Sequence, residues 1–124
     1  MLLLAPVAVL AIPPAEQRAA TVGGVRNGQE LEVEANGSSR RVRLACLQAP
    51  RPQQQPWARQ ARLQLQGQLK PGASVSVELR ARDVFGREVA VVRRNGEDVG
   101  LALLRSGAVF AYDGYLGRCD DLGY

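Results

Sequence analysis

Arginine is the side chain with the clearest chemical bias in this sequence. Fifteen arginines and one lysine stand against twelve acidic residues, which gives a formal net charge of +4. A guanidinium group binds a phosphate through two parallel hydrogen bonds, whereas lysine offers only a point charge. The composition therefore favours a phosphate-bearing partner, although a genome that prefers arginine codons would produce the same bias.

The sequence contains no histidine. This excludes catalysis by Ser-His-Asp or Cys-His groups, zinc sites with histidine ligands and proton transfer through imidazole. Any acid–base chemistry must therefore depend on carboxylates.

Two cysteines, Cys46 and Cys119, lie 73 positions apart, which excludes a Cys-x-x-Cys metal or redox motif. A disulfide between them would close most of the domain and stabilise it by roughly 4 kcal/mol through the entropy of the unfolded chain. The alternative is one buried thiol in a strand and one surface thiol near the end. We expect the disulfide if the chain is exported to an oxidising compartment.

Residues 1–20 form an apolar N-terminal segment, in which the first fourteen residues carry no charge. Its apolar run of about 12 residues is too short for a membrane span but fits the hydrophobic region of a secretory signal. No positive charge precedes it, and Ala15, Ala19 and Ala20 are weak cleavage points. We expect a signal peptide or a linker, and hence a secreted or periplasmic protein. Without a signal the protein would be cytoplasmic.

The rest of the chain, residues 21–124, has the size and composition of one domain. The whole sequence has 124 residues, of which 46% are hydrophobic and 23% charged. This mixture can form a compact core and fits neither general disorder nor a multi-span membrane protein. We expect one soluble domain without a stable membrane span.

Short strands with turns between them begin at Thr21. Asn27-Gly28 and Asn36-Gly37 are hairpin signals, because both residue types tolerate positive φ. They predict three strands, over residues 21–26, 29–35 and 40–47. The third strand alternates between an apolar face and a face that carries arginine.

An amphipathic helix over 57–70 is predicted by apolar residues four positions apart, namely Trp57, Ala61, Leu65 and Leu69. Its wet face holds Arg59, Arg62 and Gln66. Two more strands follow at 73–81 and 88–93, then a short helix capped by Asp98, and a strand-like piece at 108–112. This order predicts a mainly β fold, a five-stranded OB-fold Greek-key barrel with two or three short helices.

Three ordered motifs resemble the staphylococcal nuclease (thermonuclease-like) family. They are Val42-Arg43-Leu44 running into Gln48-Ala49-Pro50-Arg51, the segment Asp83-Val84-Phe85-Gly86-Arg87, and Leu103-Leu104-Arg105-Ser106-Gly107-Ala108. The resemblance spans about residues 21–118. It implies an OB-fold and calcium-dependent hydrolysis of DNA and RNA. It also implies that the family's last helix is missing here, so we expect the isolated chain to unfold at low denaturant.

The resemblance also assigns residues to the family's catalytic positions. Arg43 and Arg87 match its two phosphate-binding arginines. The positions of two metal-binding aspartates are held by Gln29 and Gln48, and that of the general base by Arg51. Neutral amides are weak calcium ligands, and an arginine stays protonated, so we expect no metal cofactor and no hydrolysis. Glu30 adjoins one lost ligand, but a one-residue step along a strand turns its side chain to the other face.

Our main hypothesis is a degenerate nuclease domain whose former active site, ringed by Arg43, Arg51 and Arg87, binds nucleic acid or another phosphate-bearing anion weakly. One alternative is an active calcium-dependent phosphodiesterase with a rearranged site, in which Glu30 is a candidate ligand. The other is a non-catalytic interaction module whose arginines bond to neighbouring loops. No aromatic residue occurs in the first 56 residues, so the first three strands offer no platform for base stacking.

Overall fold

The computed structural model describes residues 17–112 and 119–124, so the apolar run predicted as a signal lies outside the described residues. Strand β1 (Gln17–Asn27) begins four residues earlier than the sequence indicates. Residues 17–20, which we had grouped with the N-terminal segment, pair with β5 (Ser74–Arg82). Ala19 and Ala20 are therefore part of the sheet.

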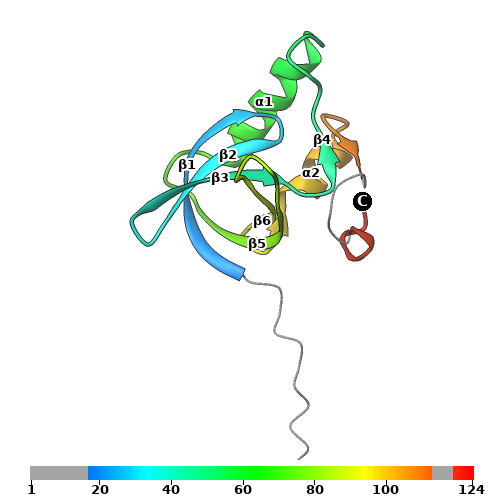
Figure 1. Ribbon diagram of the computed structural model, residues 1–124. Helices are drawn as coiled ribbons and strands as arrows, with labels where there is room; N and C mark the ends of the chain where they lie inside the picture. Colours follow the sequence, from blue (N-terminus) through cyan, green and yellow to red (C-terminus); the bar gives the residue numbers. More distant parts are fainter. Residues whose placement is uncertain (1–16, 113–118) are drawn as a thin grey trace, which may run out of the picture.

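A closed barrel of five strands forms the body of the molecule (Figure 1). Strands β2 (Glu30–Ala35), β3 (Ser38–Leu44) and β6 (Glu88–Arg94) join β1 and β5 in the order β3-β2-β1-β5-β6. Neighbouring strands run antiparallel, and a parallel pairing of β3 with β6 closes the barrel. The predicted OB-fold architecture is confirmed.

The interior of the barrel is lined by aliphatic side chains that alternate along the strands, as the sequence indicates. Val22, Leu31, Val33, Val42 and Val77 are all buried in this cluster. One end of it is covered by helix α1 (Trp57–Gln68), which buries Ala61 and Leu65 against the same residues. Within the described residues no helix is both long and apolar enough to cross a membrane.

Trp57 does not join the core, although it occupies the first position of the predicted apolar stripe. Its side chain is 57% exposed, because the first turn of α1 extends beyond the barrel (Figure 1). Helix α2 (Val99–Arg105) begins as predicted, with the Asp98 carboxylate accepting a hydrogen bond from the Leu101 amide. Near the end of the described residues, Asp120–Leu122 form a short 3-10 helix, η1.

The third predicted strand is shorter than expected. The chain leaves β3 after Leu44, and Cys46 has a positive φ of 64°. It then forms β4 (Leu47–Gln48), which pairs with β8 (Phe110–Ala111), while β7 (Glu97–Asp98) pairs with β6. The apolar pattern did not reveal this bend, because Ala45, Cys46 and Leu47 are all apolar and all buried, as they would be in a continuous strand.

The Cys46–Cys119 disulfide predicted from the sequence is present. It lies in a second, smaller apolar cluster outside the barrel, with Val89, Val91 and Leu122. The disulfide therefore attaches Cys119 to the bend after β3, where both cysteines pack beside Val89 and Val91 of β6.

A buried carboxylate organises part of the barrel. Glu88 is 1% exposed and forms ion pairs with Arg18, Arg40 and Arg82, which come from three different strands. Burial opposes ionisation of Glu88, but the hydrogen bond from Arg18 and the three positive charges outweigh it and hold the pKa of Glu88 below its ordinary value.

Glu88→Gln should lower the free energy of unfolding by about 3 kcal/mol near neutral pH, because three guanidinium groups lose their shared counter-charge. Because the pKa of Glu88 is lower in the folded protein than its ordinary value of 4.5, Glu88 contributes its full stabilisation above pH 4.5. This contribution is lost as the pH falls through the folded-state pKa. Urea unfolding across the acid range measures the difference between the two proteins. A difference that is unchanged at low pH would contradict this account, and Glu97→Gln, an exposed carboxylate, is the control.

Candidate anion-binding site

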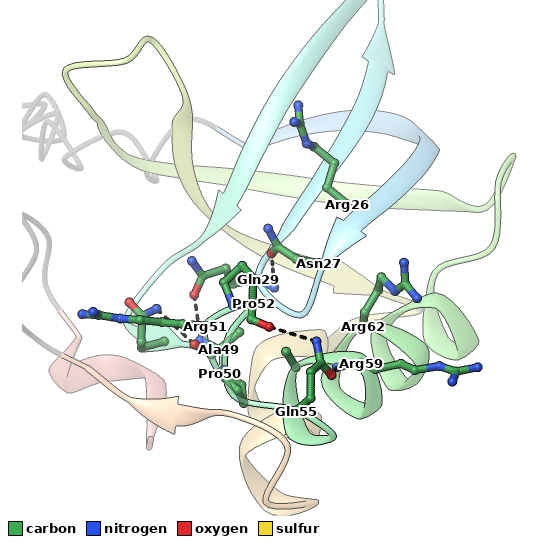
Figure 2. Close-up of a pocket in the computed structure, with 12 residues that line it drawn as sticks. Arg26, Asn27, Gln29, Ala49, Pro50, Arg51, Pro52, Gln55, Arg59 and Arg62 are labelled. Atoms are coloured by element: carbon green, nitrogen blue, oxygen red, sulfur yellow. Dashed lines mark hydrogen bonds between the residues drawn. The ribbon is translucent and has the colours of Figure 1, made fainter.

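A cleft of about 430 Å³ lies between the β1–β2 turn, the loop that follows β4 and helix α1 (Figure 2). Gly28 lets the turn approach the helix. A Cβ atom on Gly28 would lie 2.6 Å from the Cβ of Ala61 and 3.1 Å from that of Ala49, which is too close for any other residue without movement. The cleft therefore depends on the absence of a side chain at this position.

Amide side chains fix the turn against the loop. The Asn27 side-chain oxygen accepts a hydrogen bond from the Gln29 amide at 2.9 Å. The Gln29 side-chain oxygen in turn accepts one from the Ala49 amide at 2.7 Å. The first bond stabilises the turn itself, and the second joins the turn to a loop 20 residues further along the chain.

Four arginines line this cleft, and no acidic residue is among its lining residues. None of the four forms an ion pair with any residue in 17–112 or 119–124. The arginines are Arg26 from β1, Arg51 from the loop, and Arg59 and Arg62 from α1. The cleft therefore carries positive charge that no carboxylate of the described chain neutralises.

The four guanidinium groups do not converge on one point. In Figure 2, Arg59 and Arg62 extend to the right from α1, Arg26 extends upward and away from the helix, and Arg51 extends to the left. A single phosphate is held best by groups that point at the same place. This arrangement instead suits an extended ligand that bears several phosphates.

Most other arginines are paired with carboxylates. Glu30, Glu78, Asp83, Glu88 and Asp121 accept ion pairs from seven arginines: Arg18, Arg40, Arg41, Arg80, Arg82, Arg87 and Arg93. These arginines are committed to holding strands and loops together. The sequence could not distinguish them from the arginines of the cleft.

Arg43 does not line the cleft, although the sequence predicts that it rings the former active site with Arg51 and Arg87. It is 2% exposed, and its Nη2 donates to the carbonyl oxygen of Leu47 at 3.3 Å and to the side-chain oxygen of Gln48 at 3.2 Å. Gln48 itself lines the cleft. Arg43 is therefore buried beneath the surface of the cleft, and its hydrogen bond to Gln48 connects it to a residue that lines the cleft.

Arg87 also lies outside the cleft lining. Its Nε donates to Asp83, its Nη1 is 3.5 Å from a carboxylate oxygen of Glu30, and its guanidinium group lies 5.6 Å from the ring centre of Phe85. Of the three arginines expected to surround one pocket, only Arg51 lines this cleft. Arg43 and Arg87 are engaged by neighbouring oxygens instead.

Asp83 holds Arg87 and the β5–β6 loop. Its carboxylate accepts hydrogen bonds from the backbone amides of Phe85 and Arg87 as well as from the Arg87 side chain. Burial alone would raise the pKa of Asp83, but these hydrogen bonds and the charge of Arg87 lower it. Asp83 is therefore a charged anchor of the loop.

The residues that the resemblance assigns to the metal positions, Gln29 and Gln48, do not fit calcium. The Gln29 and Gln48 side-chain oxygens already accept hydrogen bonds from the Ala49 amide and from Arg43. Calcium takes six to eight oxygen ligands and prefers charged ones. Within residues 17–112 and 119–124, no group of three or more acidic, cysteine or histidine side chains could hold a metal ion.

Glu30, the candidate ligand of the rearranged-site alternative, is held by two arginines. It is 5% exposed, pairs with Arg41 at 2.7 Å and with Arg87, and is not among the residues that line the cleft. Gln29, one position earlier, does line it. The alternation of side chains along the strand separates the two, as predicted.

Sequence reasoning missed the role of Arg59 and Arg62, which it placed only on the wet face of α1. Their spacing of three on one helix face was the available signal. Nothing in the local pattern indicated that this face lies beside the turn that contains Gly28.

The chain was compared with models of known protein families and with curated proteins. The family model for staphylococcal nuclease homologues matches residues 41–121, a range that includes Arg43, Gln48, Arg51 and Arg87. No curated protein matches the chain.

Gly28→Ala should lower the free energy of unfolding by about 1–3 kcal/mol, because the added methyl group must displace Ala61 or Ala49. Gly24→Ala is the matched control, since a Cβ there meets no atom within 4 Å. Denaturant unfolding of both variants measures the effect. Equal stabilities for the two variants would show that the turn is not in close contact with α1.

Proposed function

Because this chain belongs to the staphylococcal nuclease homologue family, and so carries a nucleic-acid-related domain, we propose that it binds nucleic acid at the arginine-lined cleft without hydrolysing it. One observation carries the proposal. The cleft gathers Arg26, Arg51, Arg59 and Arg62, none of them in an ion pair with a described residue, and has no carboxylate in its lining. Another polyanion with several phosphates would satisfy the same chemistry.

Binding by such a cleft is dominated by the release of counterions from the phosphates. A single strand that contacts four arginines should show a slope of about −3 when the logarithm of affinity is plotted against that of salt concentration. The same slope corresponds to roughly fifty-fold weaker binding between 50 and 200 mM salt. The proposed interaction is therefore weak under ordinary salt conditions.

Hydrolysis lacks its chemical requirements at this cleft. A nucleophilic water needs a base to take its proton, and Arg51 at the family's base position remains protonated. The two glutamines at the metal positions are used as structural hydrogen-bond acceptors. The side chains that remain can bind a phosphate but cannot activate water.

The disulfide is consistent with an oxidising compartment. We propose that the protein acts in the periplasm or outside the cell. Nucleic acid in those compartments would be the available ligand.

Arg59→Gln combined with Arg62→Gln should weaken binding of a labelled single-stranded oligonucleotide and reduce the magnitude of the salt slope by about 1.4, since two phosphate contacts are lost. Fluorescence anisotropy at several salt concentrations provides both values. Both residues are exposed on α1, so the variant retains the buried contacts of the helix.

The matched control changes the same amount of charge outside the cleft, with Lys70→Gln and Arg105→Gln. Both control residues are exposed and do not line the cleft. Equal loss of affinity in the two double variants would contradict binding at the cleft and would indicate attraction by net charge alone.

Restoring Gln29→Asp, Gln48→Asp and Arg51→Glu together should create calcium-dependent nicking of supercoiled plasmid that a chelator abolishes. The unmodified chain should show none. A control with the same charge change elsewhere, Gln53→Asp, Gln66→Asp and Arg105→Glu, should stay inactive. Chelator-sensitive nicking by the unmodified chain would overturn the proposal that it does not hydrolyse its ligand.

A further inference from the structure

A second groove of about 290 Å³ lies between the start of α1 and the segment that leads into β8. Two aromatic side chains border it, Trp57 and Phe110, and each is 57% exposed. Pro50 and Ala108 complete its apolar surface, while Gln60 and Gln64 provide amide groups. Large aromatic residues that border a groove and remain exposed are typical of binding surfaces.

This groove adjoins the arginine-lined cleft. Pro50 lines both of them, so they lie on either side of the loop that follows β4. Phe110 is placed there by the pairing of β8 with β4, in which it lies opposite Gln48. Figure 2 shows the loop segment with Pro50 between the cleft and the ribbon of β8.

We propose that this groove stacks a nucleobase of a single-stranded nucleic acid whose phosphates lie in the cleft. The inference rests on the proposed function and deepens it by naming the class of nucleic acid. Stacking on aromatic rings tolerates any base, because every base has a flat π surface, and the amides of Gln60 and Gln64 suit its polar edge. A duplex keeps its bases inside the stack and cannot offer one to Trp57 without opening.

Charge complementarity favours this occupant over a protein. A second copy of the chain would bring another net charge of +4 against a groove that already adjoins four arginines. An apolar peptide would leave those arginines without partners. A single strand supplies an apolar base and negative phosphates in the same molecule.

Trp57 is the only tryptophan in the sequence, so its fluorescence reports on the groove directly. Three probes are compared at low salt: a short oligothymidylate, an abasic oligonucleotide with the same number of phosphates, and a duplex of the same length. We expect the oligothymidylate to quench Trp57 and to bind roughly tenfold more tightly than the abasic strand. The abasic strand and the duplex should bind without quenching.

Trp57→Leu and Phe110→Leu should each remove most of the preference for the base-bearing strand and leave binding of the abasic strand unchanged, as measured by anisotropy of labelled probes. Leu63→Ala is the control, since Leu63 is 48% exposed on the same helix and does not line the groove. Circular dichroism melts of each variant verify that it is folded.

The outcomes separate this inference from the proposed function. Equal binding of the base-bearing and abasic strands, with no change in Trp57 fluorescence, overturns the stacking site and leaves binding at the cleft in place. Failure of every probe to bind at low salt overturns both. A dimer in sedimentation experiments that Trp57→Leu dissociates would assign the groove to a second copy and also overturn the inference.

Discussion

The contact of the β1–β2 turn with helix α1 is the constraint on which the site depends. Gly28 brings the turn against Ala61, and the hydrogen bond from the Ala49 amide to Gln29 attaches the following loop to the same turn. The loop then separates the arginine-lined cleft from the aromatic groove. Both surfaces therefore derive from one close approach that only glycine permits.

The carboxylates of the chain determine where positive charge remains available. Glu88 alone holds Arg18, Arg40 and Arg82, and Asp83 and Glu30 hold Arg87. A guanidinium group that is already paired has less to gain from a phosphate. The arginines of the cleft have no such partner among the described residues, which concentrates the capacity to bind anions on one face of α1 and its neighbouring loops.

The glutamines that the resemblance assigns to metal positions have structural roles in the fold. Gln29 and Gln48 accept hydrogen bonds that an aspartate could also accept, but without charge they cannot attract a divalent cation. Under our proposal Arg51 adds positive charge where the family uses a carboxylate, which would favour binding of phosphate over its hydrolysis.

The sequence by itself determined the barrel, helix α1, the Asp98 cap and the disulfide partners, because alternation, capping and turn signals are local properties and only two cysteines were available. The tertiary structure alone decided which arginines share a surface. Arg43 and Arg87 are turned to oxygens nearby, whereas Arg26, Arg59 and Arg62 line the same cleft. That outcome depends on contacts between segments remote in the chain, and no local pattern encodes which carboxylate each guanidinium group will reach.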